Sequence, residues 1–252
     1  MSRFLASFYH LLMSFVVLAG AAYLVVFVWY PDFFYSIEGG WEGMRIIIAI
    51  DLVLGPLLTL VIFKSGKPGL KFDLACIGAL QLLCLTAGLY VVYTERPIFF
   101  IFYEGHFYGA SAGSYEDYGL TPPNPNDFSD VTPAMVVAGI PEDPIEEADY
   151  RAMLFSKGTP LWTYAEGYEP LAEHLDQIMT KGIAYDEIKS RDEHDALPLW
   201  LKKYGGSFED YAFLPVHSRF GRPFIGVRKS DRSFVNIVRV AAPMDGSYRL
   251  NE

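Results

Sequence analysis

The residues RIIIAIDLVLGPLLTLVIFKSGKPGLKFD, from Arg45 to Asp73, decide how this sequence folds. They form an apolar segment long enough to cross a bilayer, a short basic loop, and the beginning of a second apolar segment. The first segment contains an acid, Asp51, and the pair Gly55 and Pro56, all of which are unfavourable in a helix surrounded by lipid. Their presence indicates a contact with another group inside the membrane.

Three apolar segments predict three transmembrane helices. Residues 11–30 contain no charge and extend for about 30 Å as a helix, enough to span the hydrocarbon core. Residues 46–63 contain one charged residue, Asp51, and residues 74–93 contain none. The first segment continues well beyond the small residues at 19–22, so we expect a retained anchor and not a cleaved signal peptide.

The basic residues in the short connections predict the orientation. Arg3 precedes the first span and three lysines lie between the second and the third, whereas residues 31–44 carry acids and no Lys or Arg. Because positively charged loops stay in the cytoplasm, the N-terminus is expected to be cytoplasmic. After three spans, residues 96–252 are then expected on the far side, which is the periplasm if the membrane is a bacterial inner membrane.

Three explanations are open for Asp51. It hydrogen-bonds within its own chain, to Gln81, to Tyr23 or to backbone freed near Pro56; it meets a polar group on another membrane protein; or it conducts protons or ions. Pro56 cannot bond to the carbonyl of Leu52 and is expected to kink the helix. Close approach of a second backbone is expected at the glycines of the spans, at positions 20, 55, 78 and 88.

Residues 96–252 read as a small α+β domain. Residues 97–110 predict a β-hairpin that turns at Glu104 and Gly105, and residues 111–133, rich in Ser, Gly, Pro and Asn, predict a long mobile loop. Further strands are predicted at 134–140, 211–216, 222–228 and 233–240, and helices at 143–158, 169–181 and 196–204. The expected fold is thus a membrane domain, residues 1–95, with three transmembrane α-helices, followed by a small α+β extracytoplasmic domain.

Composition and motifs argue against an enzyme. The formal net charge is −10, nearly all of it beyond residue 95, which makes nucleic acid an unsuitable partner. Both cysteines lie in the third apolar segment, so the far domain contains no disulfide. His194 stands alone among acids in a cluster that reads as a solvated helix cap, and no metal, phosphate-loop or nucleophile-elbow motif occurs. We therefore expect no catalytic residues, no cofactor and no metal.

A family resemblance begins in the central stretch. It is carried by residues 51–59 (DLVLGPLLT), 63–64, 67–68, 73–74, 80–82, 88–89 and 92–93, followed by Arg96-Pro97 and the hairpin through His106 and Phe107. In these positions the sequence resembles the TfpX/TfpZ family of type IV pilin accessory proteins. The resemblance is specific from about residue 30 to residue 107.

The resemblance implies an inner-membrane accessory or chaperone protein that binds a type IV major pilin before assembly and supports pilin stability or pilus assembly. Other pilus assembly proteins are further expected partners, and an alternative is a pilin-modifying enzyme or enzyme subunit, such as one that attaches a sugar. Since Asp51 is expected about 9 Å inside the outer face, packing at Gly55 and Pro56 is favoured over pairing with a pilin amine. The candidate pilin-contact residues are Asp51, Gly55, Pro56, Thr59 and Gln81.

Overall fold

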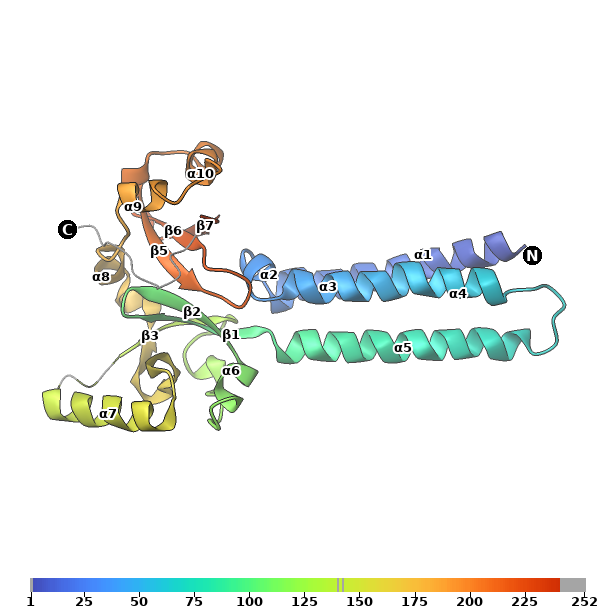
Figure 1. The fold of residues 1–252 in the computed structure, drawn as a ribbon, viewed down its shortest axis with the longest axis horizontal. Coiled ribbons are helices and arrows are strands. Elements are labelled where there is room, and N and C mark those ends of the chain that lie inside the picture. The colour runs from blue at the N-terminus through green and yellow to red at the C-terminus, as the bar shows by residue number, and fades with distance from the viewer. Residues whose placement is uncertain (1, 140, 142, 241–252) are drawn as a thin grey trace. The chain divides into compact units, whose positions relative to one another are not determined.

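The structure, a computed structural model, describes residues 2–139, 141 and 143–240. The chain forms two compact units, Met1–Arg96 and Pro97–Glu252. The first unit is helical and the second is built on a mixed sheet with helices (Figure 1). The predicted fold class is therefore confirmed: a membrane protein with three long apolar helices and a C-terminal α+β domain.

Three helices of the first unit are long and apolar enough to cross a membrane: Arg3–Trp29, Gly40–Ile62 and Leu70–Thr94. The first consists of α1 (Arg3–Tyr23) and a π-helical segment, η1 (Leu24–Trp29). The second joins α3 (Gly40–Ile48), a π-helical segment, η2 (Ala49–Leu54), and α4 (Gly55–Ile62). The third is α5 (Leu70–Thr94), and a short helix, α2 (Phe34–Ile37), lies in the first connection.

The middle helix packs closely on α5 where small residues face larger ones. A Cβ added at Gly43 would overlap a methyl of Val92, and one added at Gly88 would lie 3.1 Å from Ile47. The predicted close packing at position 88 is therefore confirmed. At Gly20 and Gly78 no atom of the described chain lies within 4 Å of an added Cβ, so close approach at these two positions stays a prediction.

The second unit contains a seven-stranded sheet with the order β4-β3-β1-β2-β5-β6-β7. Two strands, β1 (Pro97–Tyr103) and β2 (His106–Ser111), form the predicted antiparallel hairpin. Its turn uses Glu104 and Gly105, both with positive φ. The remaining strands are β3 (Ala134–Ala138), β4 (Tyr168–Pro170), β5 (Tyr211–His217), β6 (Phe224–Arg228) and β7 (Phe234–Val238).

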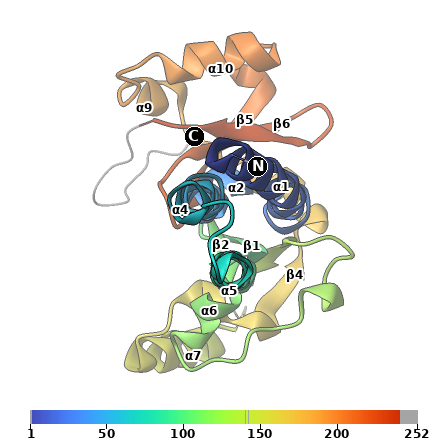
Figure 2. The same ribbon diagram turned by 90° about the vertical axis from the view of Figure 1, so that its right-hand side faces the viewer.

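Short helices flank this sheet. Figure 2 shows α9 (Tyr185–Lys189) and α10 (Ala196–Tyr204) beside β5 and β6, while α6 (Ala112–Glu116) and α7 (Pro144–Lys157) lie on the side of β1 and β2 away from them. The predicted strand at 134–140 ends at Ala138, and residue 140 lies outside the described residues. The helix predicted at 143–158 is confirmed: Asp143 caps it by accepting from two backbone N–H groups, and Gly158 ends it in the left-handed conformation.

The prediction of one helix over residues 169–181 is wrong. Residues 168–170 pair with β3 as strand β4, residues 171–173 form a 3-10 turn, and helix α8 extends only from Leu175 to Met179. Tyr168 holds the strand in place because its hydroxyl donates to the carbonyl of Trp162 and lies 2.7 Å from the Tyr115 hydroxyl. Sheet pairing and these hydrogen bonds outweigh the helical periodicity of the sequence.

The segment 111–133 has more regular structure than the predicted long loop. It contains α6 and a 3-10 turn, η3 (Pro125–Asp127), with Asn124 as its N-cap. Tyr115 is buried, and both Tyr115 and Phe128 pack edge-on against Phe99 of β1. Tyr115 and Phe128 therefore belong to the core of the domain, whereas Tyr118 is 42% exposed, and the mobility of the segment stays a prediction.

Candidate functional site

The middle helix changes its winding where the sequence places the acid and the proline. Pro56 has no N–H to donate toward Leu52, and its ring crowds the preceding turn. The helix accommodates this by the π-helical segment Ala49–Leu54 directly before Gly55. Such segments occur often at functional sites. The predicted local distortion is present in this form, and Asp51 lies within it.

Asp51 lies at the middle of its helix and not near one end. The helix begins at Gly40, earlier than expected, so Asp51 is equally far from Gly40 and from Ile62, about 16 Å by helical rise. The expected distance of about 9 Å was counted from Arg45, and Asp51 lies further than that from the end of the helix itself, while its depth below the membrane face stays a prediction. The physical reason is that Gly40–Arg45, although polar, continues the same helix.

The structure brings the five predicted site residues together. Asp51, Gly55 and Thr59 recur every four residues and, with Pro56, form one buried face of the middle helix. The side chain of Gln81, from α5, fills the space beside Gly55 and hydrogen-bonds Asp51. Of the partners expected for Asp51 within its own chain, Gln81 is thus confirmed, whereas Tyr23 is 62% exposed.

Polar residues of the first helix complete the cluster. The Ser7 hydroxyl donates to the carbonyl of Pro56 at 2.9 Å, and His10 Nδ1 lies 2.5 Å from the Thr59 hydroxyl. Ser14 is buried one turn further along. These residues were missed because the first span was expected to begin at residue 11. Their spacing of three and four residues on one helical face was the available signal.

A groove of about 210 Å³ lies over this cluster. One wall comes from α1 and the other from α5, with Asp51 of the middle helix at the base. Both α1 and α5 pack on the middle helix, and the first and third helices meet at the η1 end, where Trp29 packs on Tyr93, so the groove lies between α1 and α5 away from that contact. Its outer wall residues Met13 and Leu82 are 70% and 65% exposed. Its lining is His10, Met13, Ser14, Val17, Asp51, Gly78, Gln81, Leu82 and Leu85.

The groove suits recognition better than catalysis. Its walls are mostly apolar, and its polar groups are a carboxylate, an amide, a hydroxyl and one imidazole that is engaged by Thr59. Among the described residues, no group of three His, Cys, Asp or Glu side chains is arranged to hold a metal ion. An acid at the middle of an apolar helix and at the base of an open groove points to a polar contact with another helix.

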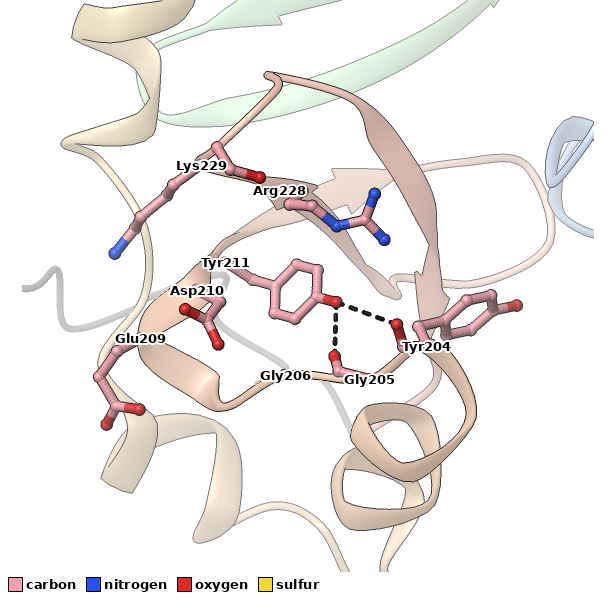
Figure 3. A pocket seen from close by; sticks show the side chains of 9 residues that line it. Tyr204, Gly205, Gly206, Glu209, Asp210, Tyr211, Arg228 and Lys229 are labelled. Carbon is pink, nitrogen blue, oxygen red and sulfur yellow. Dashed lines mark hydrogen bonds between the residues drawn. The ribbon is translucent and has the colours of Figure 1, made fainter.

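A second hollow, of about 560 Å³, lies in the sheet domain between residues 204–211 and 228–230 (Figure 3). The Tyr211 hydroxyl donates to the carbonyl of Gly205 at 2.6 Å, and Arg228 pairs with Asp231 at 3.2 Å. Hydrogen bonds from the backbone and hydroxyl of Ser207 lower the pKa of Asp210. The side chains of Asp210 and Arg228 thus stabilise local turns at the ends of strands.

The predicted helix cap around His194 is present, but the residue that caps the helix, Asp192, is buried and not solvated. The buried carboxylate of Asp192 accepts from the backbone N–H groups of Ala196 and Leu197, at 2.6 and 2.9 Å, at the start of α10. His194 itself is exposed. The cluster therefore fixes a helix end.

The fold and the groove define a class: a three-span membrane protein with a C-terminal α+β domain. Residues 1–39 match the family described as fimbrial assembly protein FimB. A fimbrial assembly protein of serogroups C1 and C2 from Dichelobacter nodosus is 36% identical over 96 residues, which cover 37% of this chain and 72% of that relative. The chain belongs to this family of fimbrial assembly proteins.

Two longer relatives match over a smaller share. The serogroup E1 and serogroup I fimbrial assembly proteins of Dichelobacter nodosus are 38% and 36% identical over 96 residues. In both, the match covers 37% of this chain and 37% of the relative, so the chain spans just over a third of their length. No solved structure matches the chain.

Proposed function

We propose that this protein is an accessory factor of type IV fimbrial assembly, of the TfpX/TfpZ type, that holds a pilin in the membrane before it enters the fimbria. The observation that carries the proposal is the open groove between α1 and α5 in a chain whose relatives are named for fimbrial assembly. A subunit waiting in the membrane needs a partner for its own apolar helix, and the groove offers apolar walls with one polar base.

The proposed role is that of a chaperone without catalytic residues. The five clustered residues, Asp51, Gly55, Pro56, Thr59 and Gln81, act on the pilin through the groove. All of them except Gln81 are buried, so they form the base of the groove and hold its walls in place. The exposed residues of the walls make most of the contact with the pilin helix. The second unit, which is acidic, contributes a contact to the soluble part of the pilin or to other assembly proteins.

The proposed location is a bacterial inner membrane, with the N-terminus and the lysine-containing loop in the cytoplasm. Lys64 and Lys71 are exposed in or beside this loop, and Lys67 pairs with Asp73 at 2.5 Å. The positive-inside rule supports this orientation, which places the sheet domain in the periplasm.

The proposal is tested by deleting the gene and measuring pilin in membranes and fimbriae on the cell surface. We expect both amounts to fall several-fold, with pilin mass unchanged, and to be restored by the wild-type gene. Normal pilin levels and normal fimbriation in the deletion strain would contradict the proposal. A change in pilin mass would instead indicate a modifying enzyme.

A further inference from the structure

Asp51 has one carboxylate oxygen that nothing in the described chain satisfies. The side chain is 4% exposed, and Oδ2 has no hydrogen-bond partner among the described residues. The side chain of Gln81 hydrogen-bonds the carboxyl group of Asp51. A buried acceptor left without a donor costs free energy, and the cost is greater in a membrane, where water is scarce.

The neighbouring polar groups do not remove this cost. His10 is close enough to interact electrostatically with Asp51, but its Nδ1 is engaged by the Thr59 hydroxyl. Ser14 and Gln81 line the same groove. Asp51 lines the groove as well, so a donor that enters the groove approaches this carboxyl group.

The dimensions of the groove indicate what kind of donor fits. Its volume of about 210 Å³ is below the roughly 300 Å³ at which small-molecule pockets begin. It therefore holds one or two side chains. Two small wall residues, Ser14 and Gly78, allow a helix to lie close along the opening, and no atom of the described chain lies within 4 Å of a Cβ added at Gly78.

We propose that the groove receives the membrane helix of the pilin and that this helix supplies a hydrogen-bond donor, neutral or cationic, to Asp51 Oδ2. The inference rests on the proposed function and names its recognition chemistry. The carboxylate selects a helix that carries a donor at mid-depth, since a wholly apolar helix would leave Oδ2 unsatisfied. The apolar walls supply the remaining contact.

The experiment uses the tagged full-length protein, extracted from host membranes in a mild detergent, and measures the pilin that copurifies. Three variants are compared with wild type: Asp51→Leu, which removes both acceptors; Asp51→Asn, which keeps one; and Asp73→Asn, which removes an acid that Lys67 already pairs. Asp73→Asn is the matched control. We expect Asp51→Leu to reduce copurified pilin about tenfold, Asp51→Asn to reduce it less, and Asp73→Asn to leave it unchanged.

Thermal unfolding of the purified variants separates recognition from folding. If Asp51 binds a donor of the pilin, then in the absence of pilin the variant Asp51→Leu is at least as stable as wild type, because an unsatisfied buried acid has been removed. Pilin capture that is equal in wild type and Asp51→Leu would overturn the inference and leave the proposed function standing. Loss of stability in Asp51→Leu in step with loss of capture would overturn it by making Asp51 structural.

Two further results overturn the inference through the identity of the occupant. Absence of pilin from the wild-type preparation would reject both the inference and the proposed function. Capture of a second copy of this chain in place of pilin, sensitive to Asp51→Leu, would assign the groove to self-association.

Discussion

At Gly43 the middle helix leaves no space for a side chain. Its position is occupied, on the α5 side, by a methyl of Val92, which as a β-branched residue in a helix has one strongly preferred rotamer. Gly78 on α5 is also a glycine within a transmembrane helix, but no described atom lies within 4 Å of a Cβ placed there. The two glycines form a matched pair.

We expect Gly43→Ala to destabilise the protein by about 1–3 kcal/mol, because the extra methyl overpacks the contact between the second and third spans. Gly78→Ala should change stability by less than about 0.5 kcal/mol. Both are measured by thermal unfolding of the full-length protein in detergent micelles. Equal effects at the two positions would show that the spans do not pack as described.

The lowered pKa of His217 predicts that the stability of the sheet domain depends on pH. Its ring stacks on Tyr108 with centroids 4.9 Å apart, and burial, with His106 and Arg222 nearby, lowers its pKa to about 4. The unfolded chain binds the proton near pH 6.5. Between these values the unfolded state holds more protons, so stability present above pH 6.5 is lost as the pH falls toward 4.

We expect this loss to be on the order of 1 kcal/mol, after allowance for the half-exposed ring. The variant His217→Phe keeps an aromatic ring and should show a smaller loss of stability over the same pH range. His194→Gln, at an exposed position, is the control and should follow wild type. Identical pH dependence in His217→Phe and wild type would contradict the prediction.

The polar cluster shows how far single residues can be predicted. Asp51 and Gln81 are polar residues in apolar spans, and burial in lipid favours their pairing, so the sequence was sufficient. Ser7 and His10 contact Pro56 and Thr59 from a helix that begins at Arg3, eight residues earlier than the uncharged run suggests. Hydropathy locates the centre of a span, and packing on neighbouring helices decides where it begins.

At the scale of elements, α10 depends on a cap that lies before its first residue. Asp192 is buried and accepts two backbone N–H groups at the start of α10, while His194 in the same cluster is exposed. We expect Asp192→Ala to cost about 1–2 kcal/mol of stability and His194→Ala to cost nothing measurable. Unfolding in detergent, followed by tryptophan fluorescence because Trp200 lies in α10, measures both. A neutral Asp192→Ala would reject the capping role.

Elements were predictable where local chemistry decides them. The cap at Asp143 and the terminating Gly158 identified α7, and the residues around Glu104 identified the β1–β2 hairpin. The failure at 169–181 has the opposite cause. Pairing with the edge of β3, about 30 residues earlier in the chain, stabilises residues 168–170 more than a local helix would. The helical periodicity of the sequence cannot indicate such a long-range contact.

At the scale of the whole molecule, the proposed orientation places the two soluble regions on opposite sides of the membrane. Ser65, in the loop before α5, and Ser230, after β6, are both exposed. We expect a membrane-impermeant maleimide to label Ser230→Cys in the periplasm of intact cells and to label Ser65→Cys only after lysis. The native Cys76 and Cys84 lie within α5 and serve as the unlabelled background. Reversed labelling would overturn the orientation.

The central claim, that the groove holds a pilin helix, is tested most directly by photo-crosslinking in living cells from two adjacent residues. Leu82 lines the groove and Leu83 lies outside it, yet they are similarly exposed, at 65% and 67%, so a crosslinker is tolerated equally at both. The account predicts a pilin adduct, identified by mass, from position 82 and little or none from position 83. Equal adducts from both positions, or adducts from position 83 alone, would contradict it.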